Sequence, residues 1–231
     1  MKLKQDMQLA YVIHSRPFRE TSLLVDMLCL EHGRIAVVAR GAKRGKFKLS
    51  SILQPFVPLH VGWHGTGDLV TLTQSEAAGQ VHDLQAKRSI CGLYMNELLF
   101  KLLNKWDPCL NLFNSYKQSL ENLAQPHVPE QAVLRSFEKE FLKSLGYGLQ
   151  LTTEIESGDP VVSNKYYKFD PVLGPRLVEN THVAAISGAT LLALETNDFA
   201  CPVALADIKR LMRVVFSYHL GARALITRQL L

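Results

Sequence analysis

The sequence predicts an α+β chain of two domains, a small five-stranded barrel followed by a helical domain. Five short segments rich in strand-forming residues follow one another within residues 1–80, and turn residues separate them. From about residue 83 onward, apolar residues recur at spacings of three and four, which is typical of amphipathic helices. We therefore expect a barrel domain over residues 1–80 and a helical domain over residues 81–231.

The five strand-like segments define the expected barrel. They are LAYVIHS (9–15), ETSLLVDMLCLEHG (20–33), RIAVVARG (34–41), FVPLHVGW (56–63) and DLVTLTQSEA (68–77). The second and third segments are joined directly at His32-Gly33, which indicates a hairpin. Five short strands within about 70 residues fit a small closed barrel. The OB fold is our first prediction for it, and an SH3-like barrel is the alternative.

The expected helices follow from the apolar spacing and from capping residues. We expect helices over about 90–102, 107–124, 129–145, 187–195 and 202–219, and a last short one after Gly221. Ser187 is a suitable N-cap for the fourth of these helices. Residues 147–182 carry many turn residues and are expected to be irregular, apart from a short strand at KYYKFDP (165–171).

Composition narrows the class of protein. The net charge is +5 and the pI is about 9.0, which favours an anionic partner. Residues 1–80 hold ten Lys and Arg against six Asp and Glu, so most of the positive charge lies in the expected barrel. The sequence shows neither a signal-peptide pattern at its start nor an apolar run of about 18 residues, so we expect a soluble cytoplasmic protein without a membrane span.

The cysteines and carboxylates give no sign of a metal centre. The four cysteines are far apart and form no CxxC pair, so we expect buried, reduced thiols and no zinc site. The expected barrel holds no cluster of closely spaced carboxylates that would suggest a metal-dependent nuclease. We therefore expect a protein that is not an enzyme and that needs no cofactor.

The stretch from Gly33 to Ser50 carries the strongest functional signal. It holds six cations and no acidic residue, and Phe47 lies between two lysines. Cations along a flexible loop, with an aromatic ring among them, suit a phosphodiester backbone whose bases can stack. We predict that nucleic acid is bound by Arg34, Arg40, Lys43, Arg44, Lys46, Phe47 and Lys48. Arg16 and Arg19 can extend this surface, and a solvated surface loop is the alternative interpretation.

The same stretch does not match a nucleotide-binding P-loop. In GAKRGK only three residues separate the glycines, and Phe47 stands where a hydroxyl would bind magnesium. We therefore expect no bound ATP.

The third expected helix carries a basic stripe beside its apolar face. Arg135 and Lys139 are four residues apart, next to Leu134 and Phe137. An apolar groove edged by cations suits a peptide that ends in acidic residues, an aromatic ring and a carboxylate. We predict a partner-peptide site at Leu134, Arg135 and Lys139, and a solvated face over a packed core is the alternative.

Four motifs resemble one family, in the expected order over about 135 residues. They are HSRPFRETSLLVDMLCLEHGR (14–34), ARGAKRGKF (39–47) with QPF (54–56), LYMNELL (93–99) and FEKEFLKSLGYG (137–148). The family is RecO, the bacterial recombination mediators. The resemblance implies an N-terminal OB fold and a helical C-terminal domain, in agreement with the patterns above.

The resemblance also implies a function. It implies a nucleoid-associated protein that binds single- and double-stranded DNA and anneals complementary strands without ATP. The implied partners are RecR and the C-terminal tail of single-strand-binding protein, and Arg135 falls at the place of the family's tail-binding arginine. Some members carry a four-cysteine zinc site after the LGYG segment, where this chain has TTEIESGDP (152–160). An OB-fold RNA-binding factor is the alternative function.

Overall fold

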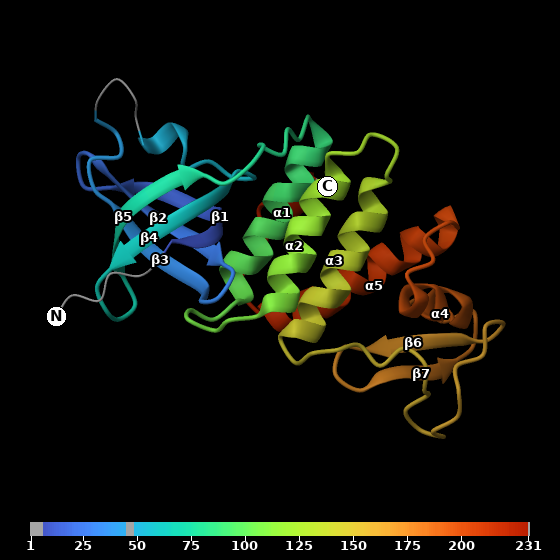
Figure 1. Ribbon diagram of the computed structural model, residues 1–231. Coiled ribbons are helices and arrows are strands. Elements are labelled where there is room, and N and C mark those ends of the chain that lie inside the picture. The colour runs from blue at the N-terminus through green and yellow to red at the C-terminus, as the bar shows by residue number, and fades with distance from the viewer. Residues whose placement is uncertain (1–6, 45–48, 231) are drawn as a thin grey trace. The chain divides into compact units, whose positions relative to one another are not determined.

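The computed structural model describes residues 7–44 and 49–230, and the chain in it forms two compact units (Figure 1). The first unit comprises residues 1–126 and 225–231, and the second comprises residues 127–224. The described residues contain a closed barrel and five α-helices, so the predicted fold class is confirmed. None of these helices combines the length and the apolar run that a bilayer crossing requires.

Five strands of the first unit close into a barrel in the order β1-β2-β3-β5-β4. Their bounds are β1 Gln8–Phe18, β2 Ser22–Cys29, β3 Gly33–Ala39, β4 Pro58–His64 and β5 Val70–Ala77, and a short 3₁₀ turn, Leu49–Ser51, precedes β4. Neighbouring strands are antiparallel except β3 and β5, which run parallel. This is the OB-like arrangement predicted from the strand pattern. Register shifts in the β1–β2 and β4–β5 pairs, where Ile13 of β1 and Thr73 of β5 are the extra residues, increase the local twist, which helps so few strands to close.

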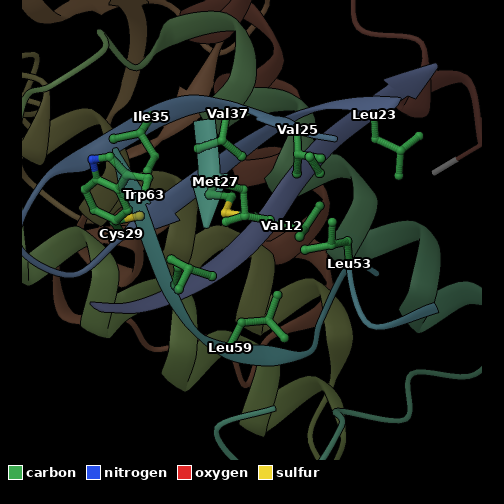
Figure 2. Close-up of a cluster of buried hydrophobic side chains, with 14 of the residues drawn as sticks. Val12, Leu23, Val25, Met27, Cys29, Ile35, Val37, Leu53, Leu59 and Trp63 are labelled. Atoms are coloured by element: carbon green, nitrogen blue, oxygen red, sulfur yellow. The ribbon is translucent and has the colours of Figure 1, made fainter. Parts of the chain in front are cut away.

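The barrel core follows from the two-residue period of the strands. Along β2, Leu23, Val25, Met27 and Cys29 all point inward, because alternate residues share a face (Figure 2). They meet inward residues of the other strands, which include Val12, Ile35, Val37, Leu59 and Trp63. These side chains are 9% exposed or less, so the barrel interior is a packed apolar core and holds no channel.

Two helices, α1 (Lys87–Leu102) and α2 (Leu110–Leu123), pack on the outside of the barrel within the same unit. The ring of Tyr11 on β1 is 1% exposed, and its centroid lies 5.7 Å from that of Phe113 and 5.3 Å from that of Tyr116. The Tyr116 hydroxyl donates a 2.6 Å hydrogen bond to Oδ1 of Asn96. The compact unit that holds the barrel therefore also contains α1 and α2 and extends to residue 126.

The C-terminal end of the chain returns to this unit at Glu97. The Glu97 carboxylate accepts hydrogen bonds of 2.9 Å from the backbone N–H groups of Ile226 and Thr227, and one of 2.6 Å from the Thr227 hydroxyl. A short 3₁₀ turn, Thr227–Leu230, begins there. Glu97 therefore acts as its cap.

The second unit combines three helices with a small sheet. Its helices are α3 (Glu130–Ser144), α4 (Gly188–Thr196) and α5 (Pro202–Leu220). Its strands are β6 (Tyr166–Asp170), β7 (Gly174–Val178) and β8 (Ile186–Ser187), in the order β7-β6-β8. The strand predicted at 165–171 is confirmed as β6, whereas the expectation of irregular structure missed β7. Ser187 caps α4 as predicted, because its hydroxyl accepts a 3.2 Å hydrogen bond from Thr190 N–H.

The cysteines differ in part from the expectation. Cys29 and Cys91 are buried, Cys109 is half-buried and Cys201 is exposed. The expectation of burial is therefore wrong for Cys201, which directly precedes α5 at the surface. All four are free thiols, and the described ranges hold no group of three or more His, Cys, Asp or Glu that could ligate a metal.

Candidate nucleic-acid interface

One side of the barrel carries a groove of about 870 Å³. It lies between the β1–β2 turn, the end of β3 and the start of β5. Three arginines line it, Arg19, Arg40 and Arg44, and Glu20 is the acidic residue among the lining side chains. Phe18, Leu69 and Thr71 contribute apolar and hydroxyl surface. The groove is therefore cationic and has an aromatic ring at its wall.

Backbone hydrogen bonds bring these segments together. The N–H of Lys43 donates to the carbonyl of Thr21 at 3.0 Å, which ties the start of the basic loop to the β1–β2 turn. The N–H of Arg44 donates to the carbonyl of Gly41 at 2.9 Å, and Gly41 supplies the left-handed φ of 66° that this turn uses. Ala42 is fully buried and anchors the loop in the barrel core. Arg40 and Arg44 therefore extend from a part of the loop that these contacts hold in place.

The charges of the three groove arginines are accessible to a ligand. Arg19, Arg40 and Arg44 are exposed, and among the described residues no carboxylate forms an ion pair with them. The guanidinium of Arg19 lies 5.3 Å from the centre of the Phe18 ring. Exposed guanidinium groups bind phosphates, and an accessible aromatic face can stack on a base. This arrangement suits a nucleic-acid strand.

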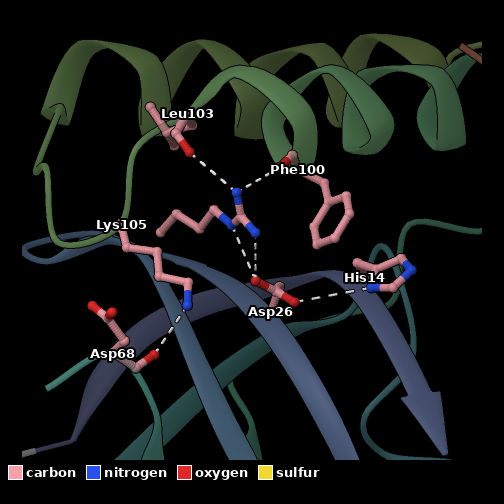
Figure 3. A network of polar contacts seen from close by, with 7 residues as sticks. His14, Asp26, Asp68, Phe100, Leu103 and Lys105 are labelled. Carbon is pink, nitrogen blue, oxygen red and sulfur yellow. Dashed lines mark hydrogen bonds and ion pairs between the residues drawn. The ribbon is translucent and has the colours of Figure 1, made fainter. Parts of the chain in front are cut away.

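Arg34 lies in a different environment, because its side chain contacts both Asp26 of the barrel and carbonyls at the end of α1. Figure 3 shows these partners, Asp26 on a barrel strand and Phe100 and Leu103 at the end of α1. Its Nε and Nη2 lie 3.0 and 2.9 Å from Oδ1 of Asp26, a side chain that is 7% exposed. Its Nη1 donates to the carbonyls of Phe100 at 2.5 Å and Leu103 at 3.2 Å. The guanidinium also lies 4.5 Å from the centre of the Phe100 ring. Arg34 therefore satisfies carbonyls at the C-terminus of α1, where a cation is favoured.

His14 completes this network. Its ring stacks on Phe100 with centroids 4.2 Å apart, and its Nδ1 lies 3.9 Å from Oδ2 of Asp26. Burial lowers the pKa of His14, although the charge of Asp26 acts in the opposite direction. His14 is therefore a neutral packing partner at pH 7. The network fixes α1 on the barrel and adds no cation to the groove.

The predicted nucleic-acid residues thus divide into three groups. Arg40 and Arg44 line the groove, and Lys43 is half-buried beside them. Arg34 does not line it, and its role in binding nucleic acid stays a prediction. The last three, Lys46, Phe47 and Lys48, lie outside the described residues.

The sequence did not single out Phe18. Phe18 is the last residue of β1 and directly precedes Arg19 in the turn, and an aromatic ring next to a cation was the signal that could have found it.

The residues predicted to bind a partner peptide make contacts inside the second unit. Leu134 is fully buried, and Arg135 is 3% exposed, with Nη1 2.8 Å from Oε2 of Glu138. The Nζ of Lys139 donates to two backbone carbonyls at the C-terminus of α4, those of Leu194 at 2.8 Å and Glu195 at 2.7 Å. In this structure neither Leu134 nor Arg135 presents its side chain to solvent, and a role for the three in peptide binding stays a prediction.

Comparison with known proteins identifies the family. The family model described as "Recombination protein O N terminal" matches residues 2–81, and "Recombination protein O C terminal" matches residues 84–228. A protein of Methylococcus capsulatus named "DNA repair protein RecO" is 45% identical over 96% of this chain and 90% of its own length. Proteins of the same name from Nitrosococcus oceani and Burkholderia lata are 43% and 41% identical, each over 97% of this chain and over 92% and 81% of their own lengths. The chain therefore belongs to the RecO family of DNA repair proteins.

Proposed function

We propose that this protein is a recombination mediator that binds single- and double-stranded DNA through its barrel and anneals complementary strands without ATP. The observation that carries the proposal is the groove lined by Arg19, Arg40 and Arg44 on an OB-like barrel. We include Lys43, Lys46, Phe47 and Lys48 as the continuation of this surface along the basic loop. RecR and the tail of single-strand-binding protein are the proposed partners, and membership of the RecO family supports them.

The distribution of charge supports this assignment. The first unit holds sixteen Lys and Arg against ten Asp and Glu, a net charge of +6. The second unit holds ten against eleven, a net charge of −1. Attraction to a polyanion therefore comes from the barrel unit, and the groove brings three of its exposed cations together.

Annealing needs no chemical step under this proposal. Two complementary strands repel each other through their phosphates, and guanidinium groups that neutralise these charges lower that repulsion. The base pairs formed then supply the free energy. A base that stacks on the Phe18 ring is kept out of base pairs within its own strand until the complementary strand arrives.

A salt titration tests the groove directly. Binding of a labelled single strand is measured between low and moderate salt for the wild type and for the double variant Arg40→Glu/Arg44→Glu. The slope of log affinity against log salt is negative, and each phosphate contact on a single strand makes it steeper by about 0.7. Losing two contacts should therefore make the slope less steep by about 1.4. We also expect ATP-independent annealing to slow in this variant.

The control is Lys87→Glu/Lys117→Glu, which changes the net charge equally but on α1 and α2. We expect its slope to stay near that of the wild type. Equal slopes for both double variants would refute the groove as the binding surface. A clear preference for RNA over DNA of the same sequence would instead favour an OB-fold RNA-binding factor.

A further inference from the structure

The groove on the barrel holds a carboxylate, that of Glu20, among its arginines. Glu20 is the middle residue of the turn that joins β1 to β2. Arg19 begins this turn with a left-handed φ of 53°. At the other end of the turn, the Lys43 N–H donates a 3.0 Å hydrogen bond to the Thr21 carbonyl. Glu20 therefore has a defined place in the wall of the groove.

The Glu20 carboxylate is accessible to a ligand. Glu20 is exposed, and within the described ranges no side chain or N–H group forms an ion pair or a hydrogen bond with its carboxylate. A carboxylate accepts hydrogen bonds and donates none, and it repels the phosphates that the groove arginines attract. A ligand group that meets Glu20 favourably is therefore a hydrogen-bond donor.

The donors of a single DNA strand lie on its bases, because phosphates only accept and deoxyribose within a strand has no hydroxyl group. On the Watson–Crick edge, thymine has one N–H between two carbonyls. Adenine and cytosine each have an amino group beside a ring nitrogen that accepts. Guanine alone presents two adjacent donors there, N1–H and the N2 amino group. A carboxylate that accepts two parallel hydrogen bonds therefore fits guanine better than the other bases.

We propose that Glu20 recognises an unpaired guanine in the groove, with its carboxylate oxygens accepting from N1–H and from the N2 amino group. This assignment rests on the proposed DNA-binding function and adds a base preference to it. Phe18 lines the same groove, so the recognised guanine stacks on that ring while the arginines bind the neighbouring phosphates. Because the same donors pair with cytosine in a duplex, Glu20 binds only unpaired guanine, and annealing ends the contact.

Labelled strands of about twelve thymines test the preference, with binding to the full chain measured by fluorescence anisotropy. One strand contains only thymine, and the others carry one central guanine, hypoxanthine or adenine. Hypoxanthine keeps N1–H but lacks the amino group. We expect the guanine strand to bind about tenfold more tightly than the all-thymine strand, with hypoxanthine between them and adenine close to thymine. Equal affinities for the guanine and all-thymine strands would overturn the proposal.

Glu20→Gln locates the preference, and Glu31→Gln is its matched control. Glutamine keeps the size of the side chain but has one acceptor oxygen in place of two and carries no charge. We expect Glu20→Gln to lose the tenfold preference for guanine and to bind the all-thymine strand at least as tightly as the wild type. Glu31 is an exposed carboxylate in the turn between β2 and β3 and does not line the groove, so Glu31→Gln should keep the preference. A preference that survives in Glu20→Gln, or that both variants lose equally, would refute the assignment.

The all-thymine strand separates this inference from the proposed DNA groove, because its binding depends on the arginines and not on guanine. If Arg40→Glu/Arg44→Glu binds this strand as the wild type does, the groove proposal fails and the role of Glu20 fails with it. If the double variant loses the strand while the wild type shows no preference for guanine, the groove stands and only the role of Glu20 is refuted.

Duplexes test whether the guanine must be unpaired. We expect the wild type to bind a duplex with a central G·C pair as tightly as one with a central A·T pair, because cytosine occupies the guanine donors. A tenfold preference for the G·C duplex would overturn the assignment.

Discussion

Replacing Arg34 by methionine should destabilise the first unit and leave its affinity for DNA unchanged. Methionine keeps an aliphatic stem over the Phe100 ring but removes the guanidinium. Asp26, which is 5% exposed, then loses its ion pair, and the carbonyls of Phe100 and Leu103 lose their donor. His14 remains near Asp26, but at 3.9 Å and with a lowered pKa it does not replace the lost charge.

The expected magnitude follows from these contacts. Removing one partner of a buried ion pair costs about 3–5 kcal/mol, because the other charge stays buried without compensation. The Arg34 side chain is 14% exposed, so water can reach part of the network. We therefore take the lower end, about 3 kcal/mol, which corresponds to a decrease in Tm of roughly 6–12 °C for a protein of this size.

Thermal unfolding and DNA titration of two methionine variants form the assay. Arg34→Met should lower Tm and bind DNA normally at temperatures where it is folded. Arg40→Met removes an exposed arginine of the groove, so it should change the free energy of unfolding by less than about 0.5 kcal/mol while weakening DNA binding. The double variant Asp26→Asn/Arg34→Met should recover part of the lost stability, because it leaves no buried charge unpaired.

The opposite pattern would refute this reasoning. If Arg34→Met keeps the Tm of the wild type and loses DNA affinity as Arg40→Met does, then the guanidinium acts on DNA and does not fix α1 to the barrel.

Three other outcomes follow from single contacts. Gly33→Ala should lower the free energy of unfolding, measured by chemical denaturation, by more than about 2 kcal/mol, because φ is +64° and a Cβ would clash with the Asp107 carbonyl. Gly41 has a similar φ but open space around it, so Gly41→Ala should lower the free energy of unfolding by about 1 kcal/mol. Burial raises the pKa of Glu97, but the hydrogen bonds from Thr227 and from the Ile226 N–H outweigh burial, so the pKa is lowered overall. Hydrogen exchange should therefore show the C-terminal turn protected above about pH 4, where Glu97 is ionised, and less protected as the pH falls below that value. Lys139→Met should speed hydrogen exchange in the last turn of α4, because two carbonyls there lose their donor.

The sequence predicted the barrel because its strands are short, rich in strand-forming residues and separated by turn residues. In β2 the alternation is imperfect, because Leu24 and Leu28 lie between the inward residues, so its composition and the turn at Gly33 identified the strand. β7 was missed because GPRLV begins with glycine and proline, which are depleted in strands. Its strand state comes from pairing with β6, which a local pattern does not reveal.

The candidate site could be predicted only in part, because sequence gives the sign of a charge and not its partner. Arg34 near the start of β3 and Arg40 directly after its end look equivalent in the sequence. The hairpin register pairs Leu28 with Arg34, which places Asp26 diagonally across from that arginine. This neighbour was predictable once the turn at Gly33 was located. The carbonyls of α1 that complete the network come from 66 and 69 residues further along the chain, and no local pattern indicates them.

The bonding of each cation, more than the net charge, sets how strongly this protein should respond to salt. Sixteen cations lie in the first unit, but Arg34, Arg88 and Lys105 already donate to backbone carbonyls. A cation held in this way gains little by meeting a phosphate, because it must first give up a bond to the protein. Six other cations lie along the groove and the basic loop, namely Arg19, Arg40, Lys43, Arg44, Lys46 and Lys48, and we expect a single strand to meet these first. If all six contact phosphates, the slope of log affinity against log salt is about −4, whereas contacts from all sixteen would give about −11. A measured slope near the first value would mean that the groove and loop account for the binding, and a much steeper one would mean that DNA reaches cations on α1 and α2.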